Sequence, residues 1–205
     1  MNDAPVTHLL YLHGFRSSPK STKARMMAAW MREHRPGVIW ACPQLPPSPC
    51  EAMACIDAAV AAWPLAGMAV IGSSLGGFYA TVLAERNGCR AVVLNPAVDP
   101  ARDLADRVGE QKSWHDDDTF FFRPGYIDEL RAMAPPPSLT RPDRYFAVIA
   151  KGDELLSWRE MKSRYAGSDG VLIEGSDHAL SDFADHLPAV VRFLQLGAAR
   201  SAGSS

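Results

Sequence analysis

Residues 68–78 read Met-Ala-Val-Ile-Gly-Ser-Ser-Leu-Gly-Gly-Phe, an apolar run followed by a turn of small residues and then by a helical pattern. The turn contains the G-x-S-x-G pattern Gly72-Ser73-Ser74-Leu75-Gly76, which has chemical meaning when it joins a strand to a helix. In that context the central serine takes a strained conformation, and the strand and helix pass too closely for side chains at the two glycines. We therefore expect Ser74 at the carboxyl end of a sheet, exposed above a helix N-terminus.

This turn has two other interpretations. A phosphate-binding loop needs Lys followed by Ser or Thr after its glycines, and Gly77-Phe78 occupies that place. A plain turn of small residues needs no chemical role at all. The position between an apolar strand and a helix favours a nucleophilic Ser74 over both alternatives.

Outward from this turn, short apolar runs alternate with longer helical patterns, which is typical of βαβ units around a buried parallel sheet. The pattern predicts an α/β fold with a mostly parallel six-stranded sheet and helices on both faces. Helices are expected over residues 22–34, around 53–63 and over about 182–196. The expected strands are 6–13, 38–41, 68–73, 91–95, 145–151 and 171–174.

The alternation breaks once, between residues 98 and 144, where proline clusters, an acidic run and several aromatic residues occur. The stretch is too long for an ordinary connection, so we expect a cap-like insertion over one end of the sheet. Residues 1–197 are expected to form one domain, and residues 198–205 have the small polar composition of a disordered tail.

The composition limits the classes of function. The chain has 205 residues, of which 47% are hydrophobic and 21% charged, with 21 basic against 23 acidic side chains. This balance predicts a folded domain and argues against nucleic-acid binding, which normally requires a basic face. The four cysteines lack C-x-x-C or zinc-ligand spacing, which indicates reduced thiols in a cytoplasmic protein.

No membrane contact is expected either. The N-terminus lacks a basic region, and the apolar stretch after it is too short for a signal peptide. Residues 52–71 are apolar enough to suggest a membrane span, but Asp57, Pro64 and Gly67 divide them into a helix, a turn and a strand.

A serine hydroxyl becomes a good nucleophile only when a base, itself oriented by a carboxylate, removes its proton. Asp153 follows the strand that ends at residue 151, and His178 follows the strand that ends at residue 174, in the loop 175–178. Because parallel strands end at the same edge of a sheet, both loops are expected beside Ser74.

The acid has competitors. Glu154 is adjacent to Asp153, and Asp99 follows the fourth strand, whereas Asp177 is next to His178 in sequence and poorly placed to reach its ring. Asp153 is favoured because it comes directly after the glycine that ends its strand.

The other five histidines can each be explained without a role as the catalytic base. His34 and His186 fall on helices, His8 lies at the first strand, and His13 is expected to be a hydrogen-bonded structural residue. His115 opens the acidic run 115–118, but no second histidine stands at ligand spacing, so a solvated loop is favoured over a metal site and no metal is expected.

An acyl-transfer site also needs hydrogen-bond donors for the oxyanion that forms at the attacked carbonyl. The loop after the first strand begins His13-Gly14-Phe15-Arg16, and Gly14 permits a tight turn. We expect the backbone N–H groups of Phe15 and Leu75 to point at the same spot, although an ordinary strand-helix turn is an alternative.

These motifs together resemble the small bacterial YqiA-type esterases of the α/β-hydrolase superfamily, over roughly residues 8–196. The resemblance rests on His-Gly-Phe-x-Ser-Ser-Pro, Gly-Ser-Ser-Leu-Gly-Gly-Phe-Tyr-Ala, Leu-Asn-Pro-Ala, Gly-Asp-Glu-Leu-Leu and Asp-His. It implies an α/β-hydrolase fold with a short cap, a catalytic triad of Ser74, Asp153 and His178, and hydrolysis of carboxylic esters without metal or organic cofactor. It does not imply a particular substrate.

The insertion suggests where a substrate would lie. Its aromatic residues are candidates for an apolar wall around a short or medium acyl ester or thioester, although packing onto their own domain is an equal alternative. Candidate substrate-binding residues are Gly14, Arg16, Trp114 and Phe121. A thioesterase, a peptidase, or an acyl-transferring or perhydrolase enzyme would use the same three residues, and a hydrolase-like protein-binding module with vestigial activity is the alternative outside the enzymes. The sequence does not indicate an oligomeric state.

Overall fold

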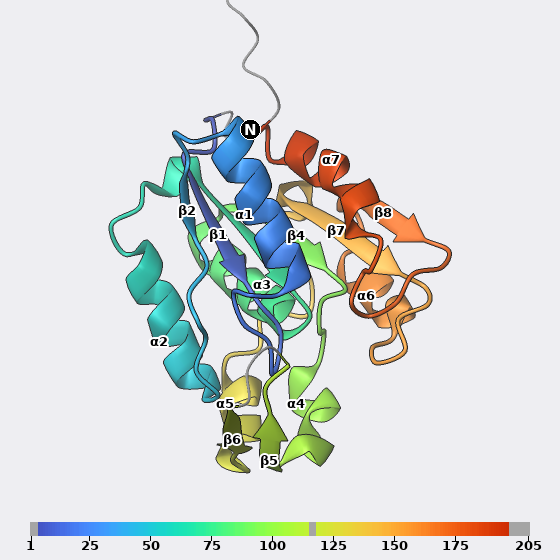
Figure 1. The fold of residues 1–205 in the computed structure, drawn as a ribbon. Coiled ribbons are helices and arrows are strands. Elements are labelled where there is room, and N and C mark those ends of the chain that lie inside the picture. The colour runs from blue at the N-terminus through green and yellow to red at the C-terminus, as the bar shows by residue number, and fades with distance from the viewer. Residues whose placement is uncertain (1–3, 115–117, 197–205) are drawn as a thin grey trace, which may run out of the picture.

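A parallel sheet of six strands forms the centre of the protein, whose computed structural model describes residues 4–114 and 118–196 (Figure 1). The strand order is β2-β1-β3-β4-β7-β8, and every neighbouring pair is parallel. The expectation of a six-stranded sheet is confirmed, with each strand end within two residues of its predicted place. The strands are β1 (His8–Leu12), β2 (Ile39–Ala41), β3 (Met68–Ser73), β4 (Arg90–Leu94), β7 (Tyr145–Ala150) and β8 (Asp169–Ile173).

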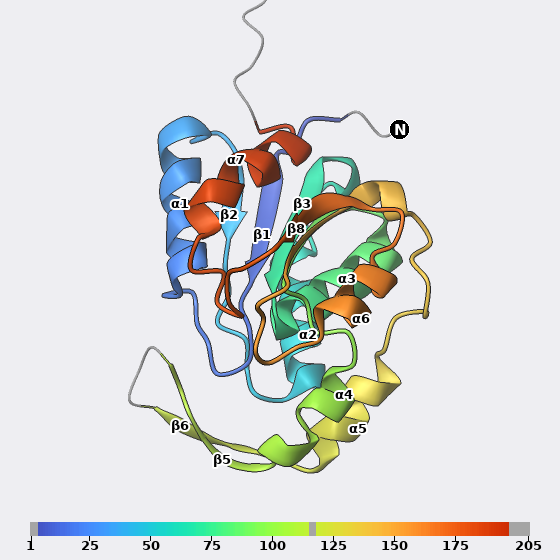
Figure 2. The same ribbon diagram turned by 90° about the vertical axis from the view of Figure 1, so that its right-hand side faces the viewer.

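Helices cover both faces of this sheet, which makes three layers (Figure 2). Helices α1 (Thr22–His34) and α7 (Phe183–Phe193) pack on one face. Helices α2 (Pro49–Val60), α3 (Leu75–Asn87) and α6 (Trp158–Arg164) pack on the other. The inner strands β1, β3, β4 and β7 are buried on both sides, which explains why they read as continuous apolar runs rather than as alternating ones. No helix in the described ranges has both the length and the apolar character needed to cross a membrane.

The sheet register brings five loops to one edge. Leu12 at the end of β1 pairs with Gly72, and Ser73 at the end of β3 pairs with Leu94 at the end of β4. Since all the strands run in the same direction, the loops that follow β1, β3, β4, β7 and β8 all begin at this carboxyl edge.

The insertion between β4 and β7 lies against the same edge (Figures 1 and 2). Helix α5 packs against α4 and α2, and its buried side chains Ile127 and Leu130 join the core on the α3 face. The expected insertion is present, but its antiparallel pair of strands was not foreseen. Its elements are α4 (Pro100–Asp103), η2 (Ala105–Arg107), β5 (Gly109–Lys112), β6 (Thr119–Phe122), α5 (Gly125–Ala132) and η3 (Pro142–Arg144), while η1 (Leu65–Gly67) precedes β3. His115 of the acidic run and the tail 198–205 lie outside the described residues.

Strand β3 passes into helix α3 through a backbone crossing that only glycine permits. A Cβ atom on Gly72 would lie 2.1 Å from the carbonyl oxygen of Gly76, and a Cβ on Gly76 would lie 2.1 Å from the carbonyl oxygen of Leu12. Both contacts are with backbone, so no side-chain rotation could relieve them. The two glycines of the sequence pattern are therefore required by the packing of α3 onto the ends of β1 and β3.

Substitution of Gly76 tests this crossing. Gly76→Ala is expected to lower the free energy of unfolding by at least about 3 kcal/mol, because an extra carbon in a filled interior forces the backbone to move. Gly37→Ala is the control, since a Cβ there would have no heavy atom within 4 Å. Chemical denaturation of both variants measures the difference, and equal stability of the two would show that the crossing tolerates a side chain.

Candidate active site

Ser74 forms the turn between β3 and α3 and has an unusual backbone conformation. Its φ is +56° and its ψ is −122°, a region that residues with a side chain rarely occupy. The peptide groups on both sides are held, because its N–H donates to the carbonyl of Leu94 at 3.0 Å and its carbonyl accepts from the N–H of Ala97 at 3.0 Å. The fixed backbone leaves the Ser74 hydroxyl partly exposed at the carboxyl edge of the sheet.

The structure brings Ser74, His178 and Asp153 into one hydrogen-bonded series. Nε2 of His178 lies 3.0 Å from Oγ of Ser74, and Nδ1 lies 2.8 Å from Oδ2 of Asp153. A carboxylate accepts hydrogen bonds only, so it favours the imidazole form that carries its proton on Nδ1. The lone pair on Nε2 then faces the serine hydroxyl, an arrangement in which the ring can accept the hydroxyl proton.

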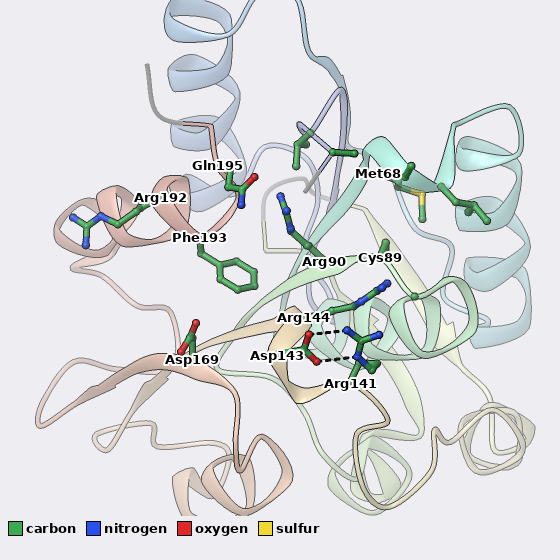
Figure 3. A pocket seen from close by; sticks show the side chains of 15 residues that line it. Met68, Cys89, Arg90, Arg141, Asp143, Arg144, Asp169, Arg192, Phe193 and Gln195 are labelled. Carbon is green, nitrogen blue, oxygen red and sulfur yellow. Dashed lines mark hydrogen bonds and ion pairs between the residues drawn. The ribbon is translucent and has the colours of Figure 1, made fainter. Parts of the chain in front are cut away.

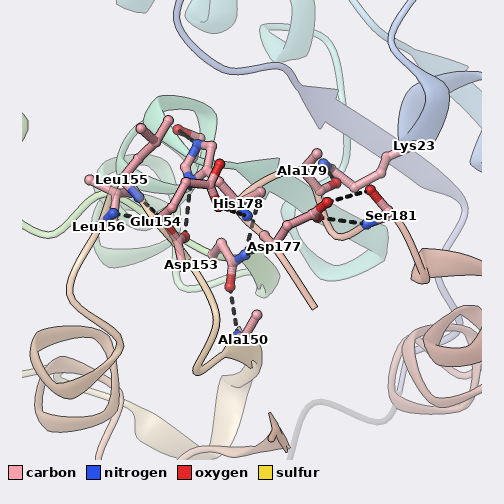
Figure 4. A network of polar contacts seen from close by, with 12 residues as sticks. Lys23, Ala150, Asp153, Glu154, Leu155, Leu156, Asp177, His178, Ala179 and Ser181 are labelled. Carbon is pink, nitrogen blue, oxygen red and sulfur yellow. Dashed lines mark hydrogen bonds and ion pairs between the residues drawn. The ribbon is translucent and has the colours of Figure 1, made fainter. Parts of the chain in front are cut away.

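The Asp153 side chain is fixed and fully buried. Its Oδ1 accepts the backbone N–H groups of Leu155 and Leu156, at 2.9 and 2.8 Å, and its Oδ2 faces the histidine ring. Each oxygen therefore has a partner, and the turn that follows β7 holds the carboxylate in place (Figure 4).

The competing carboxylates are engaged elsewhere. Glu154 accepts the backbone N–H of His178 at 2.9 Å and so contacts the histidine through its main chain. Asp177 accepts the hydroxyl and the N–H of Ser181, and these hydrogen bonds lower the pKa of the Asp177 carboxyl. Asp99 caps α4 by accepting the N–H of Arg102.

The other histidines of the described chain make contacts of a structural kind. His13 is buried, and its Nε2 accepts the N–H of Leu45 at 3.0 Å, as expected for a hydrogen-bonded structural residue. His34 lies at the end of α1, His186 lies within α7, and His8 begins β1.

Lys23 also contacts the histidine loop, a contact that the sequence did not indicate. Its ammonium donates to the carbonyl of Ala179, the residue after His178 (Figure 4). Burial lowers the pKa of Lys23 to about 8, and the negative charges of Asp177 and Asp153 partly offset that effect.

The loop after β1 lies directly against Ser74. A Cβ atom on Gly14 would lie 3.1 Å from Cβ and 3.6 Å from Oγ of Ser74, so glycine permits this close approach. Within the described residues, no acceptor is found for the backbone N–H of Phe15 or of Leu75. The loop after β1 and the N-terminus of α3, which both adjoin the serine hydroxyl, thus each contain one free N–H donor.

A cavity of about 410 Å³ adjoins this loop. Gly14, Arg16 and Leu75 line it, together with the apolar side chains Phe15, Leu45, Tyr79 and Phe120. Such a volume is within the range of small-molecule sites.

Trp114 and Phe121, which were also expected at the site, are not among the residues that line this cavity. They are 64% and 59% exposed. Successive residues of a strand point to opposite sides, and Phe120 and Phe122 both pack edge-on against the ring of Phe15. Phe120 therefore faces the cavity and Phe121 lies on the exposed side of β6. The sequence could not distinguish their directions because three phenylalanines in a row hide the alternation.

Arg16 joins the loop to the insertion. Its Nε donates to the carbonyl of Lys112 at 2.6 Å, and its guanidinium lies 4.2 Å from the ring centroid of Trp114. The backbone carbonyl of Arg16 accepts the N–H of Trp114 at 2.8 Å. Arg16 and Trp114 thus fix the position of the insertion at the rim of the cavity.

A second cavity, of about 310 Å³, lies at the opposite edge of the sheet (Figure 3). Four arginines and two aspartates line it, and Arg141 is paired with Asp143. The thiol of Cys89 also faces it, but burial raises the pKa of this thiol to about 12, which keeps it protonated and a weak nucleophile. Ser74, His178 and Asp153 are not among the residues that line this cavity.

In the part of the chain that the structure describes, no group of three or more His, Cys, Asp or Glu side chains is arranged to hold a metal ion.

Comparison with known proteins assigns the chain to a family. The model of the uncharacterised protein family UPF0227 matches residues 8–195.

Solved structures share the fold at low sequence identity. A provisionally named hydrolase of Agrobacterium vitis S4 is 16% identical with a TM-score of 0.71, over 95% of this chain and 89% of the other. The α/β-hydrolase domain-containing protein 10 of mouse is 12% identical with a TM-score of 0.69, over 91% and 90%. Est1E of Butyrivibrio proteoclasticus, solved with ferulic acid bound, is 15% identical with a TM-score of 0.69, over 96% and 90%. The chain therefore has the α/β-hydrolase fold and is distantly similar in structure to esterases and other hydrolases.

Proposed function

The chain belongs to the uncharacterised protein family UPF0227 and has the α/β-hydrolase fold, and on this premise we propose that it is a serine hydrolase that cleaves carboxylic esters. The observation that carries the proposal is the series from Asp153 through His178 to Ser74, with separations of 2.8 and 3.0 Å. A hydroxyl, an imidazole and a buried carboxylate in this order are the groups that nucleophilic acyl transfer requires.

In the proposed first step, the Ser74 oxygen attacks the carbonyl carbon of the ester. Nε2 of His178 takes the hydroxyl proton, and Asp153 stabilises the imidazolium that forms. The tetrahedral intermediate then collapses, its bond to the alcohol oxygen breaks, and the imidazolium gives its proton to the departing alcohol. An acyl group remains bound to Ser74.

In the second step, His178 takes a proton from water, and the resulting hydroxide attacks the acyl carbon. The Ser74 oxygen leaves with the proton from the imidazolium, which restores the free enzyme and releases the acid. The N–H groups of Phe15 and Leu75 stabilise the oxyanion in both steps. The absence of another acceptor for these N–H groups in the described residues supports this role.

The cavity of about 410 Å³ supports a short or medium acyl ester or thioester as substrate. Apolar side chains of Phe15, Leu45, Leu75 and Phe120 form part of its wall, next to polar ones that include Arg16, Gln44 and Asp118. The apolar part of this wall can bind the hydrocarbon of an acyl chain by the hydrophobic effect.

Substitution of the nucleophile tests the proposed function. Ser74→Ala is expected to lower kcat on p-nitrophenyl esters by at least about 10⁴-fold without loss of the fold, because removal of a triad member leaves only binding and oxyanion contacts. A fluorophosphonate should label the wild-type protein on the peptide that contains Ser74, and mass spectrometry locates the label. Ser73→Ala is the matched control, since Ser73 belongs to β3 and is buried.

Retained labelling in Ser74→Ala would identify another nucleophile. A wild-type protein that neither hydrolyses esters nor accepts the label would favour the protein-binding alternative, and a set of thioester and peptide substrates would separate the related hydrolases.

A pair of neighbouring substitutions tests the assignment of the acid. Asp153→Asn is expected to lower kcat by about 10³- to 10⁴-fold, because an amide no longer holds the proton on Nδ1 of His178. Glu154→Gln keeps an oxygen that can accept the N–H of His178, so its kcat should stay within about tenfold of the wild type. Steady-state kinetics measure both, and the reverse ranking would make Glu154 the acid.

Two adjacent phenylalanines test the substrate cavity. Phe120→Ala should enlarge the cavity and shift the preference among p-nitrophenyl esters toward longer acyl chains, by about tenfold in the ratio of kcat/KM values. Phe121→Ala removes the same atoms from the exposed side of β6 and should leave this ratio unchanged. An equal shift in both variants would place the acyl chain elsewhere.

A further inference from the structure

We propose that Asn95 is a positioning residue that sets the distance between Ser74 and His178. The inference rests on the proposed function, since it concerns the same two residues. Asn95 belongs to the Leu-Asn-Pro-Ala motif, which follows β4 and contributes no reacting group. Its side chain lies between the end of β7 and the loop that carries His178.

Asn95 is completely buried, and both ends of its carboxamide are hydrogen-bonded. Oδ1 accepts the backbone N–H of Ala150 at 2.8 Å, at the end of β7. Nδ2 donates to the carbonyl oxygen of Asp177 at 2.9 Å and to that of His178 at 3.3 Å. One planar group therefore joins the end of β7 to the two peptide groups that flank the α-carbon of His178.

The same segment also holds Ser74. The carbonyl of Leu94, just before Asn95, accepts the N–H of Ser74, and the N–H of Ala97, two residues later, donates to the carbonyl of Ser74. Residues 94–97 thus bind the serine through the main chain and the histidine loop through the Asn95 side chain.

The chemistry of the position selects asparagine. The backbone φ is +41°, a conformation that asparagine adopts more readily than most residues with a side chain. The surroundings present one N–H donor and two carbonyl acceptors, and a carboxamide offers one oxygen and two N–H groups to match them. A carboxylate of the same shape would place an oxygen against both carbonyls.

The expected effect of losing this group is on turnover rather than on substrate binding. The Nε2–Oγ distance of 3.0 Å is that of a proton-transfer contact, and an error of about 1 Å in such a contact costs about 100-fold in rate. The cavity that accepts the acyl group lies on the side of the loop after β1, and Asn95 does not line it.

The test uses Asn95→Asp and Asn95→Gly in the full-length protein. Both should lower kcat on p-nitrophenyl esters by about 100-fold while KM stays within about twofold of the wild type. Independently of turnover, the downfield proton resonance of the hydrogen bond between His178 and Asp153 should shift or broaden in both. Asn95→Gly tolerates the positive φ, so it keeps the test valid if the buried charge of Asn95→Asp prevents folding.

Thr81→Val is the matched control for loss of a buried hydrogen bond. The Thr81 hydroxyl is buried in α3 and lies 2.7 Å from the hydroxyl of Tyr165. This variant should lose stability without a change in kcat or in the proton resonance.

Wild-type kcat and an unchanged resonance in the Asn95 variants, or equal losses of kcat in Thr81→Val, would overturn the proposal. If the wild-type protein hydrolyses no ester and binds no fluorophosphonate, the proposed function fails, whereas the resonance comparison still decides whether Asn95 positions His178.

Discussion

The packing of helix α3 onto the ends of β1 and β3 is the constraint on which the rest of the structure depends. At Gly72 and Gly76 the backbones approach so closely that a Cβ would lie 2.1 Å from a carbonyl oxygen. The chain can enter the helix at this distance only through a sharp turn, which explains the positive φ of Ser74. Among the described residues, the N–H of Leu75 at the helix N-terminus also has no acceptor, as is general for the first N–H groups of a helix. The sharp turn at Ser74 therefore explains both the exposed hydroxyl and the free N–H of Leu75.

Much of this arrangement could be predicted from the sequence because it follows from topology. Apolar runs buried on both faces predict parallel strands, and parallel strands deliver their loops to one edge. Ser74, Asp153 and His178 each follow a strand end, so their convergence needs no knowledge of individual side-chain positions. The structure adds the distances, and it adds the turn at Leu155 and Leu156 that orients the Asp153 carboxylate.

The features that the sequence did not indicate depend on contacts between distant segments. Strand β5 is the polar sequence Gly-Glu-Gln-Lys, which has neither the apolar alternation nor the β-branched residues of a strand, and it forms by pairing with β6. The choice between Phe120 and Phe121 depends on which side of that pair faces Phe15. Asn95 is the clearest case, because its side chain joins the segment after β4 to the end of β7 and to the loop of His178, and no pattern within the chain predicts their meeting.

In the proposed function, the sheet edge supplies the reacting groups and the insertion supplies part of the substrate cavity, and the two parts are fixed in different ways. The sheet edge holds Ser74, Asp153 and His178 through backbone geometry, which allows little variation. Several hydrogen bonds hold the insertion to the domain. Near the loop after β1, Arg16 bonds to Lys112 of β5, and at the start of α2, Glu129 of α5 accepts the hydroxyl of Ser48 and the N–H of Cys50. Thr119 and Phe120 of β6 line the cavity. Since β6 contributes no hydrogen bond to the serine, histidine or aspartate, its residues can change without altering the proton-transfer distances. Selectivity for the acyl group can therefore vary in this fold independently of the groups that would carry out the reaction.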